Sequence, residues 1–212
     1  MFAALWGYES QASFTRAYGK MHSPPPGKTR ETGANITAYP PLHFTLTVKG
    51  EHPMNYEITR KPQYRLIGKQ WTVSTRDGEN SRVIPGYWNQ IMKDGTFTRM
   101  AKQVEPHGVF SGSCVGLALD FDDAKEQFTY MIGIERDTQE PAPGWVALTI
   151  ESMTYAVFKD QGSPLSKAIK KTFTRIFQEW FPSTGYEHAD GPEVEVYHHR
   201  DSYEVWIPVV TR

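Results

Sequence analysis

The 212-residue chain is long enough for one large domain or one domain with a small appendage, and its 39% hydrophobic residues suffice for a packed core. Its net charge of −1 argues against non-specific nucleic-acid binding by the whole chain, and no apolar run approaches the ~18 residues that a membrane span requires. The single cysteine, Cys114, excludes an internal disulfide, and the lack of a signal-peptide pattern predicts a cytoplasmic protein without membrane association.

The first predicted element is a helix over 9–21, which Ser10 can cap and whose apolar residues recur at helical spacing. The sequence SPPPG at 23–27 ends this helix. Residues 1–30 carry four Lys and Arg against one acidic residue, an excess of +3. A polar, proline-containing stretch follows, and we interpret 31–43 as a linker.

The body, 44–212, reads as two copies of one pattern. The stretch 58–68 resembles 150–158, and Tyr64 and Tyr155 occupy matching positions in the two copies. Each copy predicts a strand, a tight corner, a strand, a helix and two further strands. The fold class is therefore α+β, with tandem pseudo-twofold repeats, a largely antiparallel sheet and a ligand cleft between the halves. The helices are predicted over 81–94 and 164–180, and the later strands over 113–119, 127–135, 193–199 and 203–210.

The second helix has the clearest start signal. Ser163 is its predicted N-cap, and Pro164 takes the first helical position. A broad apolar stripe then predicts a buried face, formed by Leu165, Ala168, Ile169, Thr172, Phe173, Ile176, Phe177 and Trp180.

Acidic and aromatic residues alternate with apolar ones in the last two strands. Glu195 and Tyr197 share one face of the first, and Glu204 and Trp206 share one face of the second. A desolvated carboxylate among aromatic rings would suit a cationic aromatic ligand, whereas the same pattern also fits an ordinary solvated face. The candidate pocket walls, each of which could instead be core, are Trp88, Tyr130, Trp145, Tyr155, Tyr197 and Trp206.

Metal, cofactor and nucleophile chemistry find no support in the sequence. His198 and His199 are adjacent on a strand and point to opposite faces, and no metal-ligand spacing surrounds them, His188, Asp190 or Asp201. Cys114 has no identifiable histidine partner, so a small buried residue is the better interpretation. We therefore predict neither a metal nor a cofactor.

The N-terminal segment resembles part of a known DNA-binding motif. The sequence GYESQASFTRAY at 7–18, Lys20 and SPPPGKTR at 23–30 are similar to the turn and recognition helix of the second helix-turn-helix of AraC-type regulators. The resemblance implies that 1–30 is a helix-turn-helix remnant that contacts DNA only within a full-length regulator. The implied DNA-contacting residues are Ser10, Gln11, Ser13, Arg16 and Lys20.

The body resembles the GyrI-like (gyrase-inhibitor-like) effector-binding domain that often follows such a motif. The similar segments are PMNYEI at 53–58, IP at 84–85 with Trp88, FTY at 128–130, YAVF at 155–158, WFP at 180–182, GY at 185–186, PEVEVY at 192–197 and EVWIP at 204–208. The resemblance implies a pseudo-twofold fold over 44–212 with a cleft between the halves. It also implies that a glutamate holds the ligand, with Glu195 the first choice and Glu204 the second.

These observations predict a transcriptional regulator whose effector domain binds small, lipophilic, cationic aromatic molecules. One alternative that the resemblance implies is a hydrolase of cyclopropane-containing compounds, with Glu195 as general base or water-positioning group. A second alternative is a protein-binding module of the gyrase-inhibitor type, which would present an exposed apolar patch instead of a deep cleft.

Overall fold

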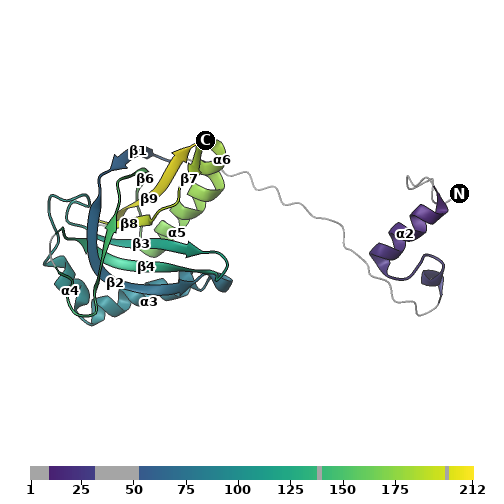
Figure 1. Ribbon diagram of the computed structural model, residues 1–212, viewed down its shortest axis with the longest axis horizontal. Coiled ribbons are helices and arrows are strands. Elements are labelled where there is room, and N and C mark those ends of the chain that lie inside the picture. Colours follow the sequence, from purple (N-terminus) through teal and green to yellow (C-terminus); the bar gives the residue numbers. More distant parts are fainter. Residues whose placement is uncertain (1–9, 32–52, 138–139, 199–200) are drawn as a thin grey trace. The chain divides into compact units, whose positions relative to one another are not determined.

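The chain divides into two compact units, Met1–Val48 and Lys49–Arg212. The computed structural model describes residues 10–31, 53–137, 140–198 and 201–212 (Figure 1). The predicted strand patch at 44–48 and the predicted linker lie outside the described residues. In the described parts, no helix is long and apolar enough to cross a membrane.

The described part of the first unit is a helix and a short turn, α2 (Gln11–His22) and η1 (Lys28–Arg30). The backbone N–H of Ser13 donates to Oγ of Ser10 over 3.2 Å, and the Ser13 hydroxyl in turn accepts from the Ser10 N–H, which forms a capping box. The predicted cap is thus confirmed. The helix ends at His22 with Ser23 as its C-cap, as the proline-rich stop signal predicts.

An antiparallel sheet forms the body. Its nine described strands are β1 (Tyr56–Lys61), β2 (Tyr64–Ser74), β3 (Cys114–Asp122), β4 (Gln127–Glu135), β5 (Val146–Ile150), β6 (Met153–Gln161), β7 (Tyr186–His188), β8 (Glu193–Tyr197) and β9 (Ser202–Thr211). The spatial order is β1-β6-β9-β8-β3-β4-β2-β5, and β7 pairs with β9 outside this path. Every pairing between these strands is antiparallel, which confirms the predicted fold class.

The strand order reflects the internal repeat. The first strand of each half crosses to the other half, since β1 pairs with β6 and β5 pairs with β2. At the centre, β3 of the first half pairs with β8 of the second. The hydroxyls of Tyr64 and Tyr155 lie 3.1 Å apart, so the two matching tyrosines meet each other. The predicted pseudo-twofold arrangement is therefore present, and the halves join along β3 and β8.

Helices lie against one face of this sheet (Figure 1). The described helical segments of the body are η2 (Arg76–Gly78), α3 (Asn80–Lys93), α4 (Thr96–Ala101), α5 (Leu165–Arg175), the π-helical turn η3 (Ile176–Trp180) and α6 (Phe181–Ser183). The predicted helix over 81–94 is confirmed as α3. The sequence interpretation missed α4 and β7, which are only six and three residues long.

The predicted start and length of the second helix need correction. Pro164 is the N-cap, in an extended conformation with ψ 144°, and Ser163 makes no capping hydrogen bond. Regular α-helix ends at Arg175, where the chain widens into the π-helical turn η3. The wider turn buries Ile176 and Trp180, as the predicted apolar stripe requires. Phe177, which the stripe also includes, is 45% exposed instead.

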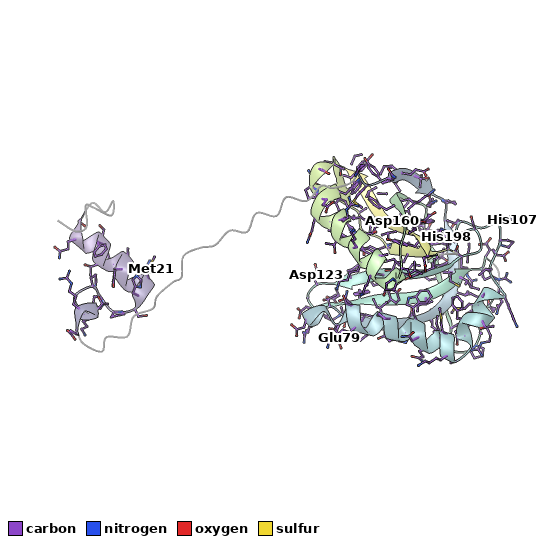
Figure 2. All side chains as sticks on the ribbon, turned by 180° about the vertical axis from the view of Figure 1, so that it is seen from behind. Met21, Glu79, His107, Asp123, Asp160 and His198 are labelled. Carbon is purple, nitrogen blue, oxygen red and sulfur yellow. The ribbon has the colours of Figure 1, made fainter. Side chains whose placement is uncertain are left out.

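Alternation along the strands separates the two faces of the sheet. The face without helices buries Val115, Val194, Val196 and Trp206 in one apolar cluster. The other face packs against the helices in three separate apolar clusters. One involves α5, and the other two involve α3 and α4. Side chains from the sheet and the helices fill the space between them (Figure 2). Residues of β3 and β8 that point to the helical face therefore lie at the junction of the halves.

Candidate functional site

Glu195 is the centre of a hydrogen-bond network on the helical face of the sheet. The hydroxyl of Tyr130 donates to Oε2 of Glu195 over 2.9 Å, and the hydroxyl of Tyr197 donates to the same oxygen over 2.5 Å. The indole Nε1–H of Trp88 donates to the Tyr130 hydroxyl over 3.0 Å. A partly buried carboxylate is thus held in place by two phenols and, through one of them, by an indole.

Elements from both halves supply these groups. Glu195 and Tyr197 point the same way because they are two residues apart on β8, whereas Tyr130 comes from β4 and Trp88 from α3. The Trp88 ring lies 4.5 Å from the Tyr197 ring at an interplanar angle of 57°. The network therefore bridges the pseudo-twofold junction, with an aromatic wall beside the carboxylate.

Gly116 on β3 makes room for this arrangement. It pairs with Glu195 in the register of β3 with β8. A Cβ atom at this position would lie 2.3 Å from the Tyr130 hydroxyl and 2.9 Å from Oε2 of Glu195, which is closer than such contacts allow. Only glycine leaves the Tyr130–Glu195 bond undisturbed here.

The electrostatics of the site follow from burial. Desolvation raises the pKa of Glu195, and the hydrogen bonds from Tyr197 and Tyr130 oppose that rise. Desolvation also raises the pKa of both tyrosines, and the neighbouring Glu195 charge raises them further, so the phenols remain protonated donors. Within the described part of the chain Glu195 forms no ion pair. The site thus offers negative charge and aromatic surface without an internal cation.

The second candidate carboxylate lies on the opposite face. Glu204 faces away from the helices with Trp206, whose indole Nε1–H donates to Oε2 of Glu204 over 2.7 Å. The Tyr155 and Trp206 rings, 5.7 Å apart, belong to that same face. Trp145 lies on the helical side, in the apolar cluster that Trp88 joins. Of the eight predicted ligand-binding residues, the structure brings together Glu195, Trp88, Tyr130 and Tyr197, and places Trp145 beside them.

His188, His199 and Cys114 are the remaining candidates from the sequence. His188 lies 3.1 Å from Glu193, and His199 lies outside the described residues. No group of three or more potential metal ligands exists among the residues that the structure describes. Cys114 is buried, as the sequence interpretation expects, and desolvation raises the pKa of its thiol to about 11, so the reactive thiolate is disfavoured.

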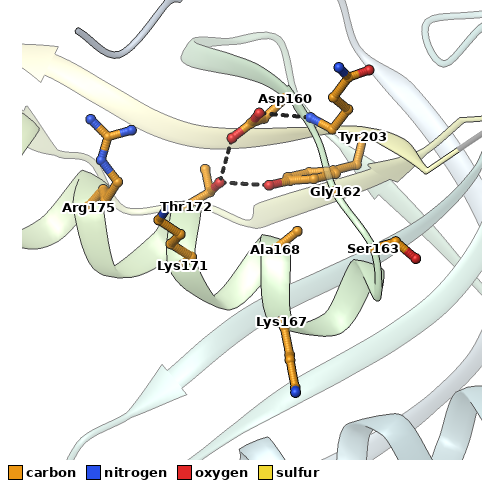
Figure 3. A pocket seen from close by; sticks show the side chains of 10 residues that line it. Asp160, Gly162, Ser163, Lys167, Ala168, Lys171, Thr172, Arg175 and Tyr203 are labelled. Atoms are coloured by element: carbon orange, nitrogen blue, oxygen red, sulfur yellow. Dashed lines mark hydrogen bonds between the residues drawn. The ribbon is translucent and has the colours of Figure 1, made fainter. Parts of the chain in front are cut away.

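A cavity of about 370 Å³ lies elsewhere, between α5 and the ends of β6 and β9 (Figure 3). Lys167, Lys171 and Arg175 line it from the helix, and Asp160 and Tyr203 line it from the strands. Its lining residues all belong to the second half and include none of the groups bonded to Glu195. Sequence reasoning missed this cavity, and also Gly116, because neither leaves a local pattern.

Comparisons with known proteins agree with this architecture. Residues 54–210 match the family of GyrI-like small molecule binding domains. A search of curated proteins found no match. Among solved structures, the chain is similar to SAV2435 bound to tetraphenylphosphonium, with a TM-score of 0.61 and 20% identity over 74% of this chain and 94% of that one.

Two further solved structures share the fold. One is a proposed transcription regulation protein from Staphylococcus aureus MU50, with a TM-score of 0.58 and 20% identity over 74% of this chain and 99% of that one. The other is an integron cassette protein from the mobile metagenome of Vibrio cholerae, with a TM-score of 0.55 and 16% identity over 73% of this chain and 95% of that one. At these identities the likeness establishes the fold of the body.

Proposed function

The chain belongs to the family of GyrI-like small-molecule-binding domains, and we propose that its ligand is a lipophilic aromatic cation held at Glu195. The observation that carries this proposal is the state of the Glu195 carboxylate. It is partly buried, it accepts hydrogen bonds from Tyr130 and Tyr197, and it has no cationic partner within the described residues. A bound cation would supply the missing countercharge.

Two interactions favour a cation at Glu195. Desolvation makes the Glu195 charge costly, as its raised pKa indicates, so a cationic ligand gains attraction that water does not already provide. The faces of Trp88 and Tyr197 add cation–π attraction of about 0.5–2 kcal/mol for each well-placed ring. A diffuse, apolar cation suits this combination better than a strongly hydrated one, because its own desolvation costs less.

A thermal-shift screen of permanently charged lipophilic cations tests the proposal. Tetraphenylphosphonium is the first probe, because a structure of the same fold was solved with it. At 100 times the dissociation constant, a ligand that binds only the folded state adds about 2.7 kcal/mol of stability. We expect a stabilisation that Glu195→Gln removes. If neutral aromatic analogues stabilise the protein equally, the ligand class is wrong.

We further propose that this body is the effector domain of a transcription regulator. The supporting observation is α2, whose exposed Arg16 and Lys20 sit on a helix capped by Ser10 and Ser13, in a segment that resembles the AraC-type recognition helix. In this proposal 1–30 is the DNA-binding remnant and 31–43 the linker. A single recognition helix lacks the scaffold contacts to phosphate that supply much of the affinity, so the 212-residue chain should bind DNA weakly. A nanomolar, sequence-specific gel shift at physiological salt would contradict that expectation.

One feature also favours an enzymatic role for the same site. A carboxylate with a raised pKa, flanked by two phenolic donors, has the chemistry of a general base that could position a water molecule. The alternative function is therefore hydrolysis of a strained, cyclopropane-containing compound by Glu195. Turnover of such a compound, lost in Glu195→Gln, would favour the enzyme, whereas saturable binding without consumption favours the sensor.

A further inference from the structure

Three side chains form an unbroken line of polar contacts on the face of the sheet opposite Glu195. Oγ of Ser113 lies 2.9 Å from Nδ1 of His198. Nε2 of His198 lies 3.3 Å from Oε1 of Glu204, whose other oxygen accepts a hydrogen bond from the Trp206 indole over 2.7 Å. Ser113 precedes β3, His198 follows β8 and Glu204 lies on β9, so three adjacent strands bring these residues together.

The contacts determine the proton positions when the imidazole is neutral. An ionised carboxylate only accepts hydrogen bonds, so Nε2 of His198 must carry the ring proton that faces Glu204. Nδ1 is then the unprotonated nitrogen, and the Ser113 hydroxyl donates to it. The serine hydroxyl thus donates a hydrogen bond to a histidine, which donates one to a carboxylate. This is the arrangement that activates a serine as a nucleophile.

We propose that Ser113, His198 and Glu204 form a nucleophilic relay that hydrolyses small carboxylic esters. This activity is separate from the Glu195 site, from which it differs in residues and in sheet face. Among the residues that the structure describes, Ser113 contacts a histidine, whereas its neighbour Cys114 does not.

The backbone around Ser113 suits this role. Phe110 to Ser113 form a tight turn, in which the Ser113 N–H donates to the Phe110 carbonyl over 3.0 Å and Ser111 and Gly112 both have positive φ, 49° and 79°. In the described residues the Gly112 N–H has no hydrogen-bond partner, and in this proposal it is the group assigned to the developing oxyanion.

The relay is partly exposed to solvent. The His198 side chain is 31% exposed and the Glu204 side chain 17% exposed, so the relay is reached from solvent while its acidic end is mostly shielded. Figure 2 shows His198 on the body.

The reaction balances with water as the only co-substrate. Oγ of Ser113 attacks the ester carbonyl carbon and its proton moves to Nδ1 of His198, while Glu204 stabilises the imidazolium. The bond to the leaving oxygen then breaks, and that oxygen takes the proton from Nδ1, which leaves an acyl group on Ser113. A water molecule, deprotonated by Nδ1 of His198, then attacks the acyl carbonyl carbon. The bond from that carbon to Oγ of Ser113 breaks, Oγ takes the proton back from Nδ1, and the carboxylic acid leaves.

The full chain is tested with p-nitrophenyl acetate as substrate and phenylmethylsulfonyl fluoride as covalent probe. We expect the probe to stop hydrolysis and mass spectrometry to locate the sulfonyl group on Ser113. Ser113→Ala and His198→Gln should each lower the hydrolysis rate at least about a hundredfold, the lower end of a positioned general base's contribution. Ser111→Gly, in the same turn, should keep the parent rate, because glycine accepts the positive φ.

Two results would overturn the proposal. One is sulfonylation at another residue or at none, and the other is hydrolysis that survives in Ser113→Ala. Glu204 is a positioning residue, so Glu204→Gln should lower kcat and leave KM unchanged. An unchanged kcat in that variant would remove Glu204 from the relay. If Ser113→Ala fails to fold, the location of the sulfonyl group on the unmodified chain still decides the question.

Discussion

Gly116 lies opposite Glu195 in the pairing of β3 with β8, and it has no room for a side chain. Gly116→Ala should therefore push Tyr130 and Glu195 apart, with a loss of stability of about 1–3 kcal/mol from overpacking and a weaker affinity for tetraphenylphosphonium. Urea unfolding measures the first effect and calorimetric titration the second.

The matched control for this substitution is Gly185→Ala. A Cβ atom at Gly185 meets nothing within 4 Å, so neither stability nor binding should change by more than a few tenths of a kcal/mol. If Gly116→Ala binds the cation as well as the parent does, the packing around the carboxylate has no part in recognition.

Tyr130 links the carboxylate to α3, because it donates to Glu195 and accepts from Trp88. Tyr130→Phe should cost about 1–3 kcal/mol of stability, since it leaves the partly buried Glu195 oxygen with one donor fewer and the indole without its acceptor. It should also weaken cation binding, because loss of the Tyr130 bond moves the pKa of Glu195 still higher.

Tyr203→Phe separates the effect on binding from a general loss of stability. The Tyr203 hydroxyl bonds to Thr172 over 2.8 Å and makes no contact with Glu195. This variant should lose stability and retain the parent affinity for the cation. Equal affinity losses in the two tyrosine variants would mean that the Tyr130 effect is indirect.

Cation binding should depend on pH through Glu195. Tetraphenylphosphonium has a fixed charge, so any pH dependence of its affinity comes from the protein. Because desolvation raises the pKa of Glu195, the affinity should increase with pH above the usual range of a glutamate and level off once the carboxylate is ionised. Titrations at a series of pH values should show this slope in the parent and none in Glu195→Gln. If the slope persists in Glu195→Gln, a group other than Glu195 causes the pH dependence.

The same pKa shift has the opposite consequence for stability without ligand. A carboxyl group whose pKa is raised on folding binds its proton more tightly in the folded state, so its contribution to stability is complete below the ordinary pKa of 4.5 and is lost as pH rises through the folded value. As pH rises through that window, the unfolding free energy of the parent should therefore fall relative to that of Glu195→Gln. Urea unfolding at several pH values measures it, and a pH-independent difference would exclude the raised pKa.

Local pattern was enough to predict most of the elements and half of the site. Alternation along 193–197 placed Glu195 and Tyr197 on one face, and strand and helix spacing located β3, β4, α3 and the repeat of Tyr64 at Tyr155. These features depend on residues close together in the chain, so the sequence exhibits them directly.

The rest of the site depends on contacts between distant segments. Alternation indicates which residues share a face within one strand, but the register between strands decides which faces coincide. Val196 pairs with Glu204, and this pairing puts Glu204 on the face opposite Glu195. The space at Gly116 and the contact of Ser113 with His198 likewise arise only when β3 lies beside β8. The local sequence does not indicate which strands will pair in this way.

The most direct test compares two glutamates by calorimetric titration with tetraphenylphosphonium. Glu195→Gln should weaken binding at least about tenfold, which corresponds to about 1.4 kcal/mol. Glu204→Gln, on the opposite face of the sheet, should bind like the parent. Binding that survives in Glu195→Gln but is lost in Glu204→Gln would contradict the assignment of the cation site to Glu195.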